Sequence, residues 1–132
     1  MPTDVIDTSV LVRYLTRDDP RKAQAAQEFL ATAAAHSLLL PDVAVAELTF
    51  VLSRVYRWPV PSVANAIRAV VNHRTIEVPG RELWLDVADD LDQGSGVVDA
   101  YLLRTAETAG IRRLVTFDEG IKPLATVECV SP

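Results

Sequence analysis

The chain has 132 residues, of which 49% are hydrophobic and 23% are charged, and its formal net charge is −5. This length and composition are typical of one globular domain with a substantial core, and they exclude a disordered or fibrous protein. The acidic balance at first counts against nucleic-acid binding, because proteins that bind nucleic acids usually carry basic surfaces. The single cysteine, Cys129, excludes an internal disulfide and a cysteine-based metal cluster.

No apolar run is long enough to cross a membrane, and the acidic start MPTDVIDTS does not resemble a signal peptide. We therefore expect a soluble, cytoplasmic protein with no membrane partner. No repeat, low-complexity tract or linker divides the sequence. Residues 1–132 are accordingly predicted to form a single domain.

Short apolar runs alternate with helical patterns along the chain. The expected strands are residues 4–7, 37–40, 75–78, 113–117 and 126–130. The expected helices begin after Asp19 and Pro20, an N-cap and first-turn pair, and then cover about 43–56, 61–72, 81–92 and 97–109, the last closed by Gly110. Strands that alternate with helices predict an α/β fold, with a mostly parallel sheet of about five short strands and helices on both faces.

Carboxylates follow two of these strands. In parallel sheets ligands bind outside the carboxyl ends of the strands, where Asp7 and Asp118 lie. We therefore expect both side chains to face the same crevice. Each is equally explained as a turn residue or as the N-cap of the following element.

Two further carboxylates lie in apolar helices. In DVAVAELTFVLSRV, every residue from Val43 to Leu52 except Glu47 and Thr49 is apolar, which predicts a helix buried nearly all round. A buried carboxylate must be paired, protonated or bound to a metal, so a salt bridge to an arginine is the structural alternative. Asp99 lies in the first turns of its helix, where the helix dipole alone favours a negative charge. Its valine and leucine neighbours nevertheless place it at the edge of the buried face.

Four carboxylates in one pocket would raise one another's pKa, and a divalent cation with oxygen ligands removes this conflict. Zinc is not expected, because His36 and His73 are far apart in the sequence and belong to no metal-binding motif. Ser9 has no nearby histidine that would activate it as a nucleophile. The GSG at 94–96 lacks the lysine of a phosphate-binding loop.

Four segments together resemble the PIN domain, and more closely the VapC toxins of bacterial toxin–antitoxin pairs. They are VIDTSVLVRYL at the start, AELTFVL, VVDAYLLRTAETAG and LVTFDEGI, and the resemblance covers essentially the whole chain. It implies a metal-dependent ribonuclease on a three-layer αβα sandwich. The glycine-rich GSGVV before Asp99 departs from the family, in which many members have a bulky aromatic residue there.

The resemblance implies catalytic roles for Asp7, Glu47, Asp99 and Asp118. Three of these residues, Asp7, Asp99 and Asp118, would be direct or water-mediated ligands of Mg²⁺ or Mn²⁺. Glu47 would be a ligand or would orient the attacking water. The supporting hydroxyl residues of the family correspond to Thr8 or Ser9, and to Thr116.

The expected partners are an RNA substrate, a cognate antitoxin and a second copy of the chain in a homodimer. Basic residues that could contact RNA phosphates follow the first strand, although they also fit an ordinary solvated face; they are Arg13, Arg17, Arg21 and Lys22. Candidate protein interfaces are residues 50–61, with Tyr56 and Trp58, and the helix around Trp84, whose indole equally fits the core.

Two other functions stay open. One is a PIN-like interaction module without catalytic activity. The other is an Asp-based phosphoryl-transfer enzyme on a similar sheet, such as a receiver or a haloacid-dehalogenase-like phosphatase. Against the second, Lys122 follows Asp118 by only four residues, and Ser9 occupies the position where the phosphatase motif needs an aspartate.

Overall fold

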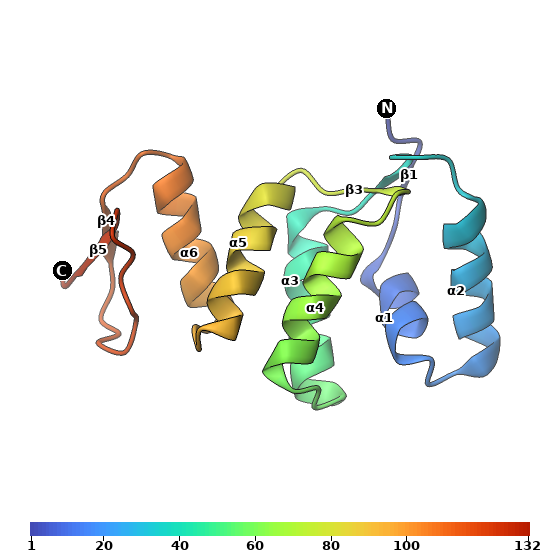
Figure 1. The fold of residues 1–132 in the computed structure, drawn as a ribbon, viewed down its shortest axis with the longest axis horizontal. Helices are drawn as coiled ribbons and strands as arrows, with labels where there is room; N and C mark the ends of the chain where they lie inside the picture. The colour runs from blue at the N-terminus through green and yellow to red at the C-terminus, as the bar shows by residue number, and fades with distance from the viewer.

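The computed structural model describes residues 1–132 as an α/β fold of six helices and short parallel strands (Figure 1). The strands are β1 (Asp4–Val5), β2 (Leu38–Leu39), β3 (Ile76–Glu77), β4 (Arg113–Val115) and β5 (Glu128–Val130). The helices are α1 (Thr8–Thr16), α2 (Pro20–Thr32), α3 (Asp42–Phe50), α4 (Val60–Val71), α5 (Arg81–Asp92) and α6 (Val97–Thr108). A π-helical segment, Val51–Val55, continues α3. The predicted α/β class is confirmed, and none of the helices has the length and apolar character needed to span a membrane.

Helix α1 is the one helix that the apolar pattern does not predict. Its sequence TSVLVRYLT contains β-branched residues that favour a strand. The Asp7 side chain accepts a hydrogen bond from the Ser9 backbone N–H at 3.1 Å and so caps the helix. Burial of Leu11 and Val12 on one face then outweighs the strand propensity.

The five strands form two separate sheets. Strands β1, β2 and β3 form a parallel sheet in that order, while β4 pairs in parallel with β5 alone. The expected single sheet is therefore not formed within one chain. Helix α6 packs against α5 and carries β4 and β5 to the opposite end of the molecule from β1 (Figure 1).

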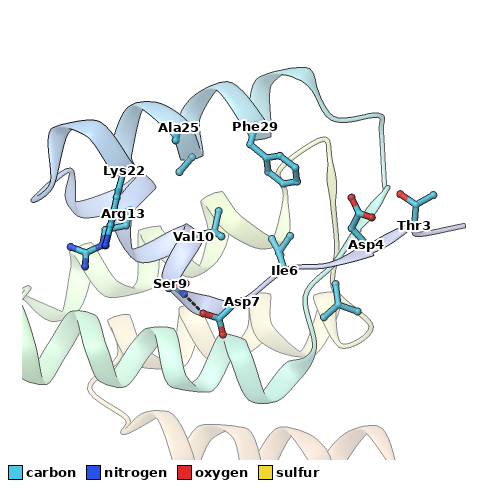
Figure 2. A pocket seen from close by; sticks show the side chains of 12 residues that line it. Thr3, Asp4, Ile6, Asp7, Ser9, Val10, Arg13, Lys22, Ala25 and Phe29 are labelled. Atoms are coloured by element: carbon cyan, nitrogen blue, oxygen red, sulfur yellow. Dashed lines mark hydrogen bonds between the residues drawn. The ribbon is translucent and has the colours of Figure 1, made fainter.

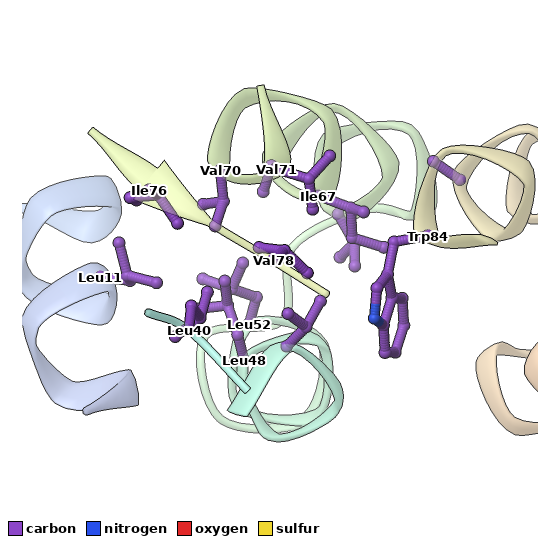
Figure 3. Packing of buried hydrophobic residues seen from close by; sticks show 14 of the residues in the cluster. Leu11, Leu40, Leu48, Leu52, Ile67, Val70, Val71, Ile76, Val78 and Trp84 are labelled. Carbon is purple, nitrogen blue, oxygen red and sulfur yellow. The ribbon is translucent and has the colours of Figure 1, made fainter. Parts of the chain in front are cut away.

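Most of the buried side chains belong to one hydrophobic core of 22 residues, which lies between the three-stranded sheet and helices α1 to α6 (Figure 3). Trp84 is fully buried in it, and its indole N–H donates a hydrogen bond to Asp42 Oδ1 at 3.1 Å. Of the two explanations for the Trp84 indole, the structure therefore supports the core. Tyr56 and Trp58 are half-buried against the same core.

A second, much smaller cluster holds the C-terminal part together. It consists of four buried residues, Leu103, Ala106, Ile121 and Val127. The side chain of Leu114 from β4 packs against it. The segment formed by α6, β4 and β5 therefore has little hydrophobic burial of its own.

Candidate functional site

The carboxylate of Asp7 is exposed at the junction of β1 and α1. Besides capping α1, its hydrogen bonds with the Ser9 side chain and backbone hold the pKa of Asp7 below its ordinary value. Asp7 is therefore fully ionised at neutral pH. The N-cap explanation is correct for this residue.

Glu47 does not lie in a buried position, contrary to the expectation from its helix. Helix α3 buries Val45, Leu48 and Thr49, whereas Glu47 is exposed and Val43, one turn before it, is 77% exposed. The helix is apolar almost all round, yet the face that carries Val43 and Glu47 has nothing packed over it. No arginine pairs with Glu47, so the salt-bridge explanation does not apply either.

Asp7 and Glu47 open onto the same cavity of about 270 Å³, which α1 and α3 line together. Its lining residues are Asp7, Thr8, Ser9, Val12, Arg13, Glu47 and Val51. The Thr8 hydroxyl is buried and donates to the Ala44 backbone carbonyl at 3.3 Å, so Thr8 ties α1 to α3. Ser9 lies at the cavity and orients Asp7.

Arg13 supplies a positive charge beside these two carboxylates. Its guanidinium donates to both Asp18 carboxylate oxygens, at 2.8 and 2.9 Å, and Asp18 also accepts from the Tyr56 hydroxyl at 2.5 Å. The Tyr56 and Arg13 hydrogen bonds lower the pKa of Asp18 from 3.8 to about 2. Asp18 therefore fixes Arg13 at the edge of the cavity. Arg17 instead donates to Gln27 at 2.9 Å and lies outside the cavity.

The other two proposed acids lie in the C-terminal part. Asp99 is half-buried in the first turn of α6 and lines a small cavity of about 90 Å³ together with Gly120 and Lys122. Asp118 is exposed after β4, and its carboxylate accepts a hydrogen bond from the Gly120 N–H at 2.7 Å. The hydroxyl of Thr116 accepts from the Asp118 N–H at 2.9 Å and shapes this turn.

The four carboxylates thus do not gather in one cluster. Asp7 and Glu47 belong to the N-terminal part, and Asp99 and Asp118 belong to the segment carried by α6. No three acidic, histidine or cysteine side chains lie close enough together to hold a metal ion. The residues of a single chain therefore do not fit a metal centre, and the expectation that Asp7 and Asp118 share a crevice is not met within one chain, because β1 and β4 belong to different sheets.

A larger groove of about 870 Å³ begins at Asp7 and runs along β1 and α2 (Figure 2). Figure 2 shows Ile6, Val10 and Phe29 on its floor and walls, with Arg13 and Lys22 at one end. The groove therefore combines an apolar wall with a positive end next to Asp7.

The PIN-domain family matches residues 5–126, a range that includes all four acids. The chain belongs to the PIN-domain family. PIN domains commonly act as nucleases and typically bind metal. A comparison with curated proteins finds no match.

Sequence reasoning missed Asp18 and Tyr56, which hold Arg13 in this PIN domain. Asp18 stands in RDDP directly before the N-cap Asp19, and the pattern there indicates only a helix start. Tyr56 is 38 residues away from Asp18 and meets it only through the packing of α1 against α3 and its π-helical extension. No local signal in the sequence points to this contact.

Proposed function

We propose that this PIN-domain protein is a ribonuclease that hydrolyses RNA phosphodiester bonds and acts in the cytoplasm as the toxin of a VapBC-type pair. The observation that carries the proposal is the cavity onto which two exposed carboxylates, Asp7 and Glu47, open beside Arg13 in a chain of this family. The likeness to VapC toxins in VIDTSVLVRYL and LVTFDEGI supports the toxin role.

The residues at this cavity suit phosphodiester hydrolysis. Arg13 keeps guanidinium N–H groups that Asp18 does not use, and a guanidinium binds phosphate oxygens with good geometry. Glu47 would orient the attacking water through its exposed carboxylate. Electrostatic positioning of this kind supplies most of the rate in phosphoryl transfer.

Mg²⁺ or Mn²⁺ is the proposed cofactor, because carboxylates are the ligands that these ions prefer. The acids of one chain do not gather around a common point, so we assign no step of the reaction to the metal. The proposed ligands are Asp7, Asp99 and Asp118.

A cognate antitoxin is the proposed protein partner. An antitoxin segment that covers the cavity beside Asp7, Glu47 and Arg13 would suit this role. Such a segment would block the access of RNA to Asp7.

Cleavage of a fluorescent RNA by the purified protein tests the nuclease assignment. We expect cleavage with Mg²⁺ or Mn²⁺ and none in EDTA, and a decrease of about 10²-fold or more for Asp7→Asn and Glu47→Gln, as for other groups that act on the transferred proton or charge. In a bacterial host, expression of the wild type should arrest growth and the two variants should not.

Asp86→Asn is the matched control, because Asp86 is an exposed carboxylate on α5 that makes no hydrogen bond or ion pair and lies outside the cavities. It should cleave like the wild type. Full cleavage by the Asp7 and Glu47 variants would contradict the site, and cleavage in EDTA would contradict the metal requirement.

One observation favours a second function, an interaction module without catalytic activity. The four acids do not meet in a single chain, and a chain that acted alone would therefore lack a metal centre. Absence of cleavage by the wild type under all metal conditions, together with binding of an antitoxin, would support this function instead.

A further inference from the structure

Strands β1 and β4 each have one edge without a partner, as do the outer strands β3 and β5. Strand β1 pairs only with β2, through Asp4 with Leu38 and Val5 with Leu39, so its other edge is free. Strand β4 pairs only with β5, and its other edge is free as well. Every pairing in both sheets is parallel. Parallel strands are almost always enclosed in larger sheets, and free edges are templates for pairing with another strand.

Large apolar side chains accompany the free edges of β1 and β4. Beside β1, Val5 is 68% exposed and Phe29, across the groove on α2, is 42% exposed. At β4, Val115 is 56% exposed and Phe117 is 84% exposed. Side chains alternate along a strand, and Leu114 turns toward the small C-terminal cluster. Val115 and Phe117 therefore present the opposite, uncovered face.

The C-terminal segment has too little core to hold its strands by itself. Only four buried residues stabilise α6, β4 and β5 beyond the contact with α5. An isolated two-stranded sheet is at best marginally stable in water. Additional burial against another surface would supply the hydrophobic stabilisation that this cluster lacks.

The free edges of β1 and β4 do not meet within one chain. Arg104 on α6 donates two hydrogen bonds to Asp90 on α5, at 2.7 and 2.8 Å, and the Trp84 ring contacts the tilted Tyr101 ring at 5.0 Å between centroids. These contacts fix α6 on the outer side of α5, and Figure 1 shows β4 at one end of the molecule and β1 beyond α3 toward the other. Pairing of β4 with a β1 strand therefore needs the β1 of another chain.

We propose that a second copy of this chain supplies it: two chains pair reciprocally, β4 of each on the free edge of β1 of the other. Each half of the pair is then a five-stranded parallel sheet in the order β3, β2, β1, β4, β5. Val115 and Phe117 of one copy occupy the groove lined by Val5, Ile6 and Phe29 of the other. Because the exchange is reciprocal, the assembly closes as a dimer and leaves only the outer edges of β3 and β5 unpaired.

Charge complementarity favours the same arrangement. The groove carries Arg13 and Lys22 at one end and Asp4 at the other. Strand β4 begins with Arg113 and is followed by Asp118 and Glu119. A parallel alignment places Arg113 near Asp4 and the acids after β4 near Arg13 and Lys22. An antiparallel alignment would oppose like charges.

The exchange also explains the separation of the acids. Each complete site would combine Asp7 and Glu47 of one copy with Asp118, and with Asp99 nearby, of the other. A single chain would lack the full set of carboxylates. Strand pairing is inferred from the fold alone. The predicted effect on RNA cleavage also depends on the proposed ribonuclease function.

The mass of the untagged wild-type chain in solution is the first test. Light scattering should give twice the chain mass of 14.4 kDa. Position-specific cross-linking is the second test, in a Cys129→Ser background that lacks the single native thiol. Chains with Val5→Cys and chains with Val115→Cys, expressed together with different tags, should be joined by a short bismaleimide into a covalent pair that contains both tags. Neither variant expressed alone should form this product.

A chain that carries both Val5→Cys and Val115→Cys distinguishes strand exchange between two chains from pairing of β4 with β1 of the same chain. Exchange predicts a covalent dimer, and a cross-link confined to single chains would overturn the proposal. A wild-type mass of one chain, or an open series of larger assemblies, would overturn it as well, independently of any enzymatic result.

Complementation then tests the shared site. Asp7→Asn and Asp118→Asn should each be inactive alone, and their co-expression in equal amounts should restore roughly a quarter of wild-type cleavage. Half of the dimers then contain one chain of each variant, and in each mixed dimer one of the two sites has all its carboxylates. Cross-linking without restored cleavage, where the wild type is active, would overturn the shared site. Cross-linking with an inactive wild type would contradict the proposed function and leave the pairing supported.

Discussion

Asp18 illustrates how one side chain connects stability with the candidate site. It accepts hydrogen bonds from Tyr56, Arg13 and Thr16, and these hold its pKa at about 2. Arg13, which we propose to bind phosphate, is thus oriented by a carboxylate that stays ionised under all physiological conditions. The arrangement joins α1 to the end of the π-helical segment after α3.

The pH dependence of stability should therefore change in Asp18→Asn. Because the pKa of Asp18 in the folded protein lies below the ordinary 3.8, its ionised form stabilises the fold above that pH. This stabilisation is lost as the pH falls from 3.8 toward about 2. Urea unfolding between pH 7 and pH 3 should show a steeper decrease in the free energy of unfolding for the wild type than for the variant.

Tyr56→Phe removes the hydrogen bond that lowers this pKa most, and it should give an intermediate slope. Asp19→Asn is the matched control, since Asp19 caps α2 through Lys22 N–H at 3.1 Å and an asparagine caps equally well. If all four proteins lost stability in parallel, Asp18 would have no special role in the folded state.

At the scale of the elements, the packing of α6 on α5 decides the shape of the molecule. Arg104 forms a bidentate ion pair with Asp90 and also donates a hydrogen bond to Glu107. Its side chain is only 21% exposed. The Asp90 and Glu107 hydrogen bonds raise the pKa of Arg104 further above its ordinary value. This ion pair is better shielded from solvent than any other in the protein.

Arg104→Met should accordingly lower the free energy of unfolding by about 1.5–3 kcal/mol, the range for hydrogen bonds to charged groups, because Asp90 loses its partner in a largely buried position. Arg68→Met is the matched comparison on the other side of α5, where Arg68 bonds to the more exposed Asp89 and Asp92. It should cost about 1 kcal/mol or less. Urea titration of both variants measures the difference, and equal losses would contradict the role assigned to Arg104.

At the scale of the whole molecule, the two hydrophobic clusters are unequal. The large core stabilises the part from β1 to α5, while the C-terminal segment relies on four buried residues and its contact with α5. Apolar side chains are left exposed where the two sheets end. A dimer with exchanged strands would bury them, and its stability would then depend on protein concentration.

Thermal unfolding should therefore shift with concentration. If folded dimer unfolds to separated chains, each tenfold increase in protein adds about 1.4 kcal/mol. For two chains of this length that corresponds to roughly 2–3 °C in Tm. Phe117→Lys, which places a charge on the uncovered face of β4 without touching the core, should remove the dependence. A wild-type Tm that stays constant over a hundredfold range of concentration would contradict a dimeric folded state.

The sequence by itself determined the local features. The pair Asp19 and Pro20 predicts the start of α2, and the Asp19 side chain caps it as expected. Gly110 adopts φ of 71°, which closes α6 as predicted. Apolar runs bounded by turn residues predict all five strands. These features depend on neighbours within a few residues, so composition and spacing are enough to identify them.

Only the tertiary structure decided which surfaces are covered. An apolar helix predicts a buried Glu47, but the carboxylate is exposed, because no element packs over that face of α3. Trp84 fits an interface or a core from its sequence alone, and the hydrogen bond to Asp42, 42 residues away, places it in the core. The separation of Asp7 from Asp118 depends on where α6 packs, which no local pattern specifies. Long-range packing of this kind follows from the fit of whole elements to one another, and so no short stretch of the sequence specifies it.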